Sequence, residues 1–284
     1  MSLIDLTSLL QQAQEERYAV GAFNVMNLET VQAVIGAAEA TRSPVIIEVA
    51  EVHAEKAGLE SIGPIMLHEA ECASVPVCVH LDHGTRFELL LESITMGFSS
   101  VMADFSDDAY PAHIARTQEI VKIAHTLNCD VEAELGHIAS SEDTTEQSGA
   151  QGKAYTDPEQ AKDFVAQTGI DALAISFGSV HGIYKKEPQL DYARIRDIAS
   201  HVDVPLVMHG GSGLEEAIYH QVIQHGISKI NYYSACSRLT ANEIKTRLNR
   251  SEEVFFHDIA FWGRDIIKAH ICGVMDVFGS SGKA

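Results

Sequence analysis

Histidines and carboxylates of this chain cluster at the ends of short apolar runs, where side chains from distant segments can meet. These residues are Asp82, His83, Asp104, Glu134, His181 and His209, and the amide of Asn231 lies in the last run. Three imidazoles suit a Zn²⁺ ion that keeps one coordination position open for substrate, whereas Mg²⁺ and Ca²⁺ prefer oxygen ligands. Any single one of the fourteen histidines is more often packed or hydrogen-bonded. Their joint placement predicts a zinc site at His83, His181 and His209.

Carboxylates beside these histidines supply the other parts of a reaction centre. Asp82 adjoins a proposed ligand, so it can reach a metal-bound substrate without binding the metal, and it is the candidate general acid and base. Asp104 and Glu134 could hydrogen-bond the ligating imidazoles, form an alternate metal position or make a buried salt bridge. We favour hydrogen bonding to the imidazoles.

A glycine-rich turn follows the third proposed ligand. It reads His209-Gly210-Gly211-Ser212-Gly213, and a helix is predicted to begin near Leu214. Glycines let backbone N–H groups approach a phosphate, which a helix N-terminus also attracts. Lys185 could add a positive charge, although a solvated loop lysine is the commoner case. The position of the turn beside a proposed metal ligand strengthens an otherwise weak signal.

Apolar runs and helical spacing alternate along the chain. The predicted strands are Val20–Val25, Pro44–Ala50, Pro76–Asp82, Phe98–Asp104, Asp130–Leu135, Asp171–Phe177, Val204–Gly210 and Ser228–Tyr232. Between them, helical periodicity predicts helices over Leu28–Ala40, Phe87–Met96, Ile114–Leu127, Glu159–Thr168 and Leu214–His225. Strand–helix repetition favours a parallel sheet, and eight units favour its closure into a barrel.

The expected fold is therefore α/β, a (β/α)8 TIM barrel formed as a single domain by residues 1–284. The carboxyl ends of barrel strands carry the active site in this fold, which would bring the residues named above together. One segment breaks the rhythm: residues 136–154 are polar and rich in glycine and serine. We interpret it as a mobile active-site loop, with a disordered surface excursion as the alternative.

Bulk composition excludes several classes of partner and location. A net charge of −20 argues against nucleic acid, and no run approaches the roughly 20 apolar residues of a membrane helix. The first residues include Asp5, Glu15 and Glu16 and show no targeting pattern, so a cytoplasmic location is expected. Five scattered cysteines without a C-x-x-C pair predict neither a disulfide framework nor a thiolate zinc site.

Several linked motifs carry a resemblance that covers nearly the whole chain. They are Ala22-Phe23-Asn24, His80-Leu81-Asp82-His83-Gly84, Ser100-Val101-Met102-Ala103-Asp104, Val131-Glu132-Ala133-Glu134-Leu135-Gly136, Ser179-Val180-His181-Gly182-Ile183-Tyr184-Lys185 and His209-Gly210-Gly211-Ser212-Gly213. In this order they resemble the class II fructose-bisphosphate and tagatose-bisphosphate aldolases.

The resemblance implies a metal-assisted cleavage. Zinc on His83, His181 and His209 would polarise the ketose C2 carbonyl and stabilise the enediolate, and Asp82 would take the proton of the C4 hydroxyl. Glu142 matches a loop glutamate that exchanges the proton on the enediolate carbon. The residues assigned to substrate are Asn24, Gly182, Lys185, Gly210, Gly211, Ser212, Asn231, Tyr232, Tyr233, Ser234 and Arg264. A monovalent cation (Na⁺ or K⁺) and a homodimer or homotetramer are also implied.

The implied substrate is a fructose- or tagatose-type ketose 1,6-bisphosphate, cleaved to dihydroxyacetone phosphate and glyceraldehyde 3-phosphate. Departures from the family pattern concern the aldehyde half. Tyr232 and Tyr233 replace small residues and are expected to reshape or fill the pocket, and Phe105 replaces a glycine. Arg264 is the nearest candidate for the distal phosphate. Acidic residues that would repel this phosphate are Glu48, Glu51, Asp107 and Asp108.

Other functions stay open at this point. One is cleavage of a ketose 1-phosphate without a distal phosphate, and another is a non-catalytic sugar-phosphate-binding relative, against which the retention of Asp82 and all three histidines argues. A metal-dependent hydrolase on the same barrel ranks lower, because that class needs a His-x-His pair on an early strand and Val20–Val25 contains no histidine.

Overall fold

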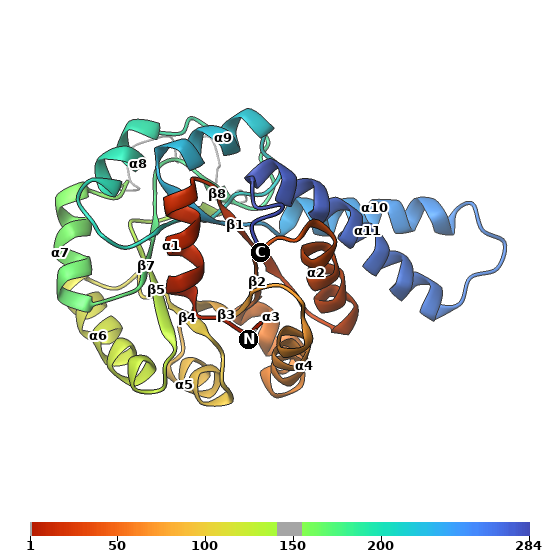
Figure 1. Ribbon diagram of the computed structural model, residues 1–284, viewed down its shortest axis with the longest axis horizontal. Coiled ribbons are helices and arrows are strands. Elements are labelled where there is room, and N and C mark those ends of the chain that lie inside the picture. The colour runs from red at the N-terminus through yellow and green to blue at the C-terminus, as the bar shows by residue number, and fades with distance from the viewer. Residues whose placement is uncertain (1, 141–154) are drawn as a thin grey trace.

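Eight parallel strands close into a barrel in the computed structural model, which describes residues 2–140 and 155–284 (Figure 1). Around the barrel the order is β1-β10-β9-β7-β5-β4-β3-β2. These strands are β1 (Val20–Asn24), β2 (Val45–Ala50), β3 (Val77–Gly84), β4 (Ser100–Ala103), β5 (Asp130–Leu135), β7 (Ala172–Ile175), β9 (Leu206–Met208) and β10 (Ile227–Asn231). The predicted (β/α)8 TIM barrel is confirmed.

Each of the eight predicted apolar runs overlaps one barrel strand, and most strands are shorter than the run, although β3 extends two residues beyond its run and β10 begins one residue before it. The run Val204–Gly210, for example, contains only β9, because strand pairing stops before His209. Two short strands that the pattern did not predict, β6 (Ala139–Ser140) and β8 (Val180–His181), pair with each other in a separate parallel sheet. His181 therefore lies on a strand outside the barrel wall.

Helices surround the barrel, as Figure 1 shows. They are α1 (Leu6–Glu16), α2 (Leu28–Thr41), α3 (Glu51–Ala57), α4 (Leu59–Cys72), α5 (Phe87–Met96), α6 (Tyr110–Thr126), α7 (Pro158–Thr168), α8 (Tyr192–Ala199), α9 (Glu216–His225), α10 (Ser234–Leu248) and α11 (Phe256–Phe278). The five predicted helices are present as α2, α5, α6, α7 and α9. In α5 the end is clear from the sequence, because Gly97 adopts the left-handed conformation that stops a helix.

The two ends of the barrel interior differ in polarity. At one end, Leu6 and Leu10 of α1 pack against Val20, Ile46 and Val207 from the strands in a buried apolar cluster. Towards the carboxyl ends of the strands, alternate positions carry polar groups instead. These are Glu48 on β2, His80 and Asp82 on β3, Glu132 and Glu134 on β5, and Lys229 and Asn231 on β10, all of them buried. Two-residue alternation thus places a polar layer above an apolar floor.

Helices α10 and α11 form a hairpin that projects beyond the barrel in Figure 1. Its outer part exposes the large side chains Phe255, Phe256 and Phe261. The base of the hairpin is anchored, because Ile271 and Met275 of α11 are buried in the main core. Among the described residues, no helix is both long enough and apolar enough to cross a membrane.

Candidate active site

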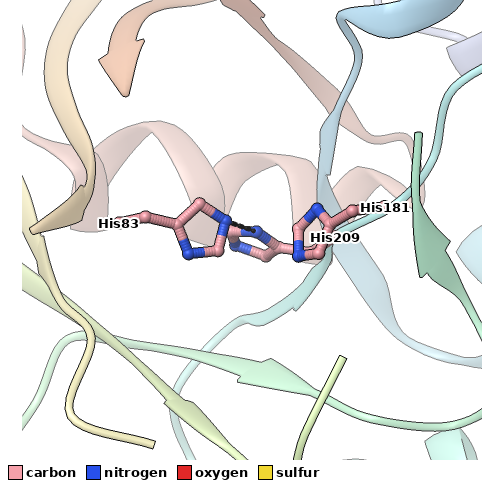
Figure 2. A group of neighbouring side chains, drawn as sticks. All are labelled: His83, His181 and His209. Carbon is pink, nitrogen blue, oxygen red and sulfur yellow. Dashed lines mark hydrogen bonds between the residues drawn. The ribbon is translucent and has the colours of Figure 1, made fainter. Parts of the chain in front are cut away.

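Three histidine rings face one another at the carboxyl end of the barrel (Figure 2). His83 comes from β3, His181 from β8, and His209 directly follows β9. A nitrogen of each ring lies within 4.8 Å of one from both other rings. The ring centroids are 4.9 Å apart for His83 and His181 and 4.6 Å apart for His83 and His209. His83 and His181 also line a cavity of about 300 Å³.

The direction of the His83 ring depends on a local irregularity of β3. Simple alternation would turn Asp82 and His83 to opposite faces of the strand. Between Leu81 and Gly84 the pairing of β3 with β4 shifts register, and His83 has a φ of 49°, which is uncommon for a residue with a side chain. This break in the strand allows both side chains to serve the same site.

Carboxylates orient two of the three rings. Nδ1 of His83 lies 2.6 Å from Oδ2 of Asp104, and Nε2 of His209 lies 2.8 Å from Oε1 of Glu132. When these nitrogens carry the protons and donate, the lone pairs of His83 Nε2 and His209 Nδ1, which are 3.0 Å apart, face the centre of the triad. Such carboxylate–histidine contacts accompany most metal-binding histidines. As an arrangement of donor atoms, the triad fits zinc.

The charges around the triad favour a cation at its centre. Burial lowers the pKa of His83, but the carboxylates of Asp82, Asp104 and Glu134 outweigh burial and raise this pKa to about 10. Burial, followed by the charge of His83, lowers the pKa of His181 to about 4 and that of His209 well below its ordinary value. His181 and His209 are therefore neutral at pH 7, the form that binds metals.

Asp82 lies beside the triad and is held on both oxygens. The side-chain amide of Asn24 donates to Oδ2 at 3.1 Å, and that of Asn231 donates to Oδ1 at 3.0 Å. Oδ1 is also 3.8 Å from Nε2 of His83. Burial raises the pKa of Asp82, but the positive charge of His83, with smaller effects from other neighbours, lowers it to about 2. Asp82 is thus an oriented, ionised carboxylate that can accept a proton.

Glu134 lies next to the pair formed by His83 and Asp104, and the three groups offer ligand atoms within 4.8 Å of one another. Oε1 of Glu134 accepts a hydrogen bond from the backbone N–H of Ile138 at 3.2 Å. Burial, with a further effect from Asp104, raises the pKa of Glu134 to about 8. Of the two residues expected to support the histidines, Asp104 contacts His83 directly. Among the described residues, Glu134 makes no such contact and instead forms, with His83 and Asp104, a second group of possible metal ligands.

The glycine-rich turn after His209 is fixed by contacts at the same end of the barrel. A Cβ at Gly210 would lie 2.3 Å from the carbonyl oxygen of Val180, so only glycine fits there. The hydroxyl of Tyr184 donates to the Gly210 carbonyl at 2.7 Å, and Ser212 Oγ accepts from the N–H of Tyr233 at 2.8 Å. Helix α9 begins at Glu216, two residues later than predicted, because residues 211–214 form a turn first.

The two tyrosines after Asn231, which were expected to reshape or fill the pocket, point in different directions. The Tyr232 hydroxyl lies 3.0 Å from Nε2 of His270, and the Tyr232 ring packs against Phe23 and Phe278, away from the triad. Alternation along β10 explains this, since Asn231 points into the barrel and the next residue points out. Tyr233, at the start of α10, instead contacts the ring of His53, with centroids 5.0 Å apart.

The acidic residues expected to repel a distal phosphate are mostly compensated. Glu48 is buried inside the barrel, 3.6 Å from Nζ of Lys229. Glu51 accepts hydrogen bonds from the backbone N–H groups of Thr85 and Arg86. Asp108 pairs with Arg116, whose guanidinium covers the buried ring of Phe105. Only Asp107 is highly exposed, so the expected repulsion is weaker than the composition of this region predicted.

The remaining predicted residues lie outside this cluster or beyond the described residues. Arg264 is in the N-terminal half of α11, in the projecting hairpin, where its guanidinium pairs with Asp265 and covers Phe261. Lys185 is exposed on the segment after His181. Gly182 directly follows His181, and Ser234 begins α10. Glu142 and most of the proposed loop 136–154 lie outside the described residues.

Sequence reasoning overlooked three residues that the fold brings to the site: Glu132, Lys229 and His53. Glu132 contacts His209, Lys229 contacts Glu132 at 2.7 Å, and His53 contacts Tyr233. A signal for the first two was present. Glu132 lies two residues before Glu134 and Lys229 two residues before Asn231, so each faces the same side of its strand as a proposed site residue. No such signal marks His53, since α3 was not predicted.

Comparisons with known proteins agree with this geometry. The family described as "Fructose-bisphosphate aldolase class-II" matches residues 4–283. The chain is 39% identical to a fructose-bisphosphate aldolase of Geobacillus stearothermophilus, over 100% of this chain and 99% of that protein. It is 37% identical to a fructose-bisphosphate aldolase of Staphylococcus aureus, over 100% of both chains.

Among solved structures, the YdjI aldolase from Escherichia coli K12 is similar to the whole chain. It superimposes with a TM-score of 0.88 at 33% sequence identity, over 99% of both chains. Agreement of family, relatives and fold over the full length leaves one assignment: the chain belongs to the class II fructose-bisphosphate aldolase family and is an aldolase, a carbon–carbon lyase.

Proposed function

We propose that this protein is a zinc-dependent aldolase that reversibly cleaves a fructose- or tagatose-type ketose 1,6-bisphosphate to dihydroxyacetone phosphate and glyceraldehyde 3-phosphate. We further propose that the whole chain acts as one catalytic domain. The observation that carries the proposal is the convergence of His83, His181 and His209 beside Asp82, an ionised carboxylate held on both oxygens. Bound there, zinc would act as a Lewis acid on the carbonyl of the ketose.

Asp82 performs the proton transfer in this mechanism. Its carboxylate accepts the proton of the C4 hydroxyl while the C3–C4 bond breaks, so that C4 becomes the aldehyde and the bonding electrons stay with the three-carbon fragment. In condensation Asp82 returns the same proton to the new C4 oxygen. Asn24 and Asn231 keep both carboxylate oxygens oriented through this exchange. Glu142 is proposed to exchange the proton on C3 of the three-carbon fragment.

Backbone groups of the glycine-rich turn are proposed to bind the phosphate of dihydroxyacetone phosphate. Gly210, Gly211 and Ser212 lie between His209 and the start of α9, Ser212 contacts the N–H of Tyr233 just before α10, and Gly182 follows His181. A phosphate there would be shared by N–H groups and the exposed Lys185, and a monovalent cation (Na⁺ or K⁺) would balance its charge. This location leaves the part of the barrel mouth beside His53 and Tyr233 for the aldehyde half of the substrate.

A second candidate substrate is a ketose 1-phosphate without a distal phosphate. It is supported because Arg264, the candidate for the distal phosphate, already pairs with Asp265. Arg86 and Arg116, at the same end of the barrel as the triad, likewise pair with Glu51 and Asp108. A non-catalytic sugar-phosphate-binding role is disfavoured because the triad and Asp82 are assembled together. The projecting, aromatic-rich hairpin of α10 and α11 suits the proposed homodimer or homotetramer.

Zinc analysis and chelation test the catalytic proposal. Purified protein should contain about one zinc per chain, since three histidines form one site. Removal with a chelator should abolish cleavage, and adding zinc should restore it. A protein that contains no zinc and keeps full activity in chelator would refute the proposal.

A panel of ketose phosphates, with and without the distal phosphate, separates the two substrate classes. A bisphosphate aldolase should cleave fructose or tagatose 1,6-bisphosphate with a far higher kcat/KM than the 1-phosphates. Arg264→Ala should reduce this difference in kcat/KM between the two substrate classes. Arg250→Ala, which removes an exposed arginine near the end of the same hairpin, serves as the control. Equal activity on both classes would count against a bisphosphate substrate.

A further inference from the structure

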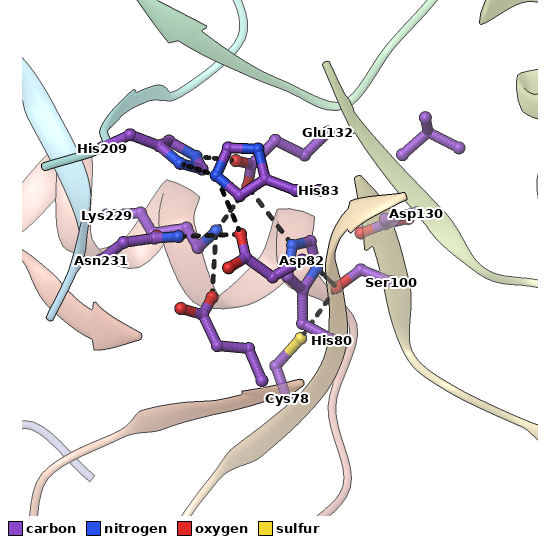
Figure 3. A network of polar contacts seen from close by, with 12 residues as sticks. Cys78, His80, Asp82, His83, Ser100, Asp130, Glu132, His209, Lys229 and Asn231 are labelled. Atoms are coloured by element: carbon purple, nitrogen blue, oxygen red, sulfur yellow. Dashed lines mark hydrogen bonds and ion pairs between the residues drawn. The ribbon is translucent and has the colours of Figure 1, made fainter. Parts of the chain in front are cut away.

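A charged layer lies inside the barrel, and Figure 3 shows it beside His83 and His209, two members of the histidine triad. Its members Glu48, Glu132 and Lys229 have no solvent exposure. Oε1 of Glu132 lies 2.8 Å from Nε2 of His209, and Oε2 accepts a hydrogen bond from Nζ of Lys229 at 2.7 Å. One carboxylate therefore connects a proposed metal ligand with a buried ammonium group.

Stability alone does not account for this layer. Burying charged groups costs several kcal/mol each, and a well-packed apolar replacement is often as stable or more so. The floor of the same barrel is filled in that apolar way, by Val20, Ile46 and Val207. The charges in the layer that touches His209 therefore indicate a task at the site above.

The contact of Glu132 with His209 determines which ring nitrogen is free. A carboxylate accepts but does not donate, so Nε2 of His209 must carry the proton in this contact. The lone pair then remains on Nδ1, which lies 3.0 Å from Nε2 of His83 and faces the centre of the triad. With the opposite tautomer, His209 would present an N–H to the metal and could not bind it.

Lys229 fixes the position of this carboxylate. Its ammonium group binds Oε2 of Glu132 and lies 3.6 Å from Oε2 of Glu48. Neither oxygen of Glu48 has a hydrogen-bond partner among the described residues, and Glu48 makes no such contact with the triad. Glu48 thus shares the charged layer and the lysine without touching a proposed metal ligand.

We propose that Glu132 and Lys229 are a positioning pair that holds His209 with Nδ1 ready for the metal. Glu132 accepts the Nε2 proton, and Lys229 anchors the second oxygen of Glu132. Neither side chain reaches the substrate, so both act through His209. This inference rests on the proposed zinc site and adds two residues to it.

Zinc affinity of the metal-free protein tests the pair, measured by competition with a chromophoric chelator. Glu132→Asp keeps the charge opposite Lys229 but withdraws the carboxylate from His209, and it should weaken zinc binding about 10- to 100-fold. Lys229→Met should weaken it in the same direction. Glu48→Gln is the matched control, because it changes the same layer without a contact to His209, and its zinc affinity should equal that of the wild type.

Long-range ¹H–¹⁵N NMR of the histidine rings supplies a second readout that does not require a folded variant. In the metal-free wild type, the spectrum should show His209 protonated at Nε2. Circular dichroism of the variants separately shows which of them fold. A wild type that binds no zinc defeats the proposed function itself. Tight zinc binding by Glu132→Asp, an equal loss in Glu48→Gln, or a His209 protonated at Nδ1 would each overturn the positioning pair alone.

Discussion

The two sides of the barrel mouth are built differently. On the metal side, His83, His209 and Asp82 each have charged or amide partners within 3.1 Å. On the aldehyde side, which we define as Met26, His53 and Tyr233, the contacts are a tilted pair of rings and a long contact of 3.7 Å from the Tyr233 hydroxyl to sulfur. The metal side is preorganised by directional bonds, whereas the aldehyde side is shaped by packing.

This difference separates the two half-reactions. Charge develops in the chemistry on the metal side, and oriented polar groups stabilise it without having to reorganise. The aldehyde side selects a molecule by shape, so its residues can change while the proton transfer is retained. Substitutions on the two sides should therefore affect different measurements.

Asp82→Asn should produce the largest effect. Loss of the general base typically costs about 10²- to 10⁴-fold in rate, so kcat should fall by this factor in a cleavage assay. Zinc content should stay at the wild-type level, because Asp82 is a neighbour of the triad and not one of its three histidines. Asp130→Asn is the control, because it makes the same change at the first residue of β5, at the opposite end of the barrel from Asp82. A zinc-loaded Asp82→Asn enzyme with normal kcat would remove Asp82 from the mechanism.

Tyr233→Ala should have an intermediate effect confined to the aldehyde half. Differences in pocket packing discriminate substrates by about 10- to 200-fold, so the ratio of kcat/KM between aldehydes should change by at least the lower figure. Proton exchange into dihydroxyacetone phosphate alone should remain unchanged. Tyr232→Phe, whose hydroxyl lies behind the strand against His270, should alter neither measurement. Equal losses in exchange and condensation would show that the two sides are not separate.

Glu51→Gln should have the smallest effect, on stability. Glu51 lies at the start of α3, which carries His53 to the aldehyde side, and it accepts hydrogen bonds from Thr85 and Arg86. Loss of the charged acceptor should lower the free energy of unfolding by about 1–3 kcal/mol at pH 7. Urea unfolding measures this loss. Glu55→Gln, on an exposed neighbour 3.7 Å from Arg86, should change it little.

Acid should reduce the effect of Glu51→Gln. Burial raises the pKa of Glu51, but the hydrogen bonds from Thr85 and Arg86 outweigh it and hold the pKa below its ordinary value of 4.5. The ionised group therefore stabilises the fold fully above pH 4.5, and this contribution is lost as the pH falls through the lowered pKa. The difference between wild type and variant should shrink over that range. A difference independent of pH would exclude the ionised contact as its origin.

Much of the fold was predictable because the signals are local. Apolar runs indicated all eight barrel strands, and the polar residues at their ends indicated which end carries the site. The other helices were given no predicted range, and two of them show why the bounds are hard to predict: α1 closes the apolar floor and α11 packs on α2, so their positions depend on the surfaces they cover. Some strands were predicted to end too late, because a residue such as His209 lies in the loop after the strand and takes no part in strand pairing.

The site was predictable by residue type but not by direction. His83, His181 and His209 could be chosen from their places after strands, whereas the ring orientation of His83 depends on a φ of 49° and a register shift. The charges of Glu48 and Glu51 were counted as free because their partners, Lys229 and Arg86, are far away in the sequence. Tyr232 and Tyr233 were treated alike because adjacency does not reveal which side chain faces the barrel.

The sequence by itself determined the repeating pattern of strands and helices, the set of metal-binding and proton-transferring side chains, and a family resemblance that fits both. These depend on residue type and on short spacing, which the chain carries without folding. Only the tertiary structure decided which carboxylate orients which imidazole, which charges are compensated and which tyrosine faces the mouth. Those outcomes depend on pairs of groups tens of residues apart, and closure of the barrel brings them within hydrogen-bonding distance.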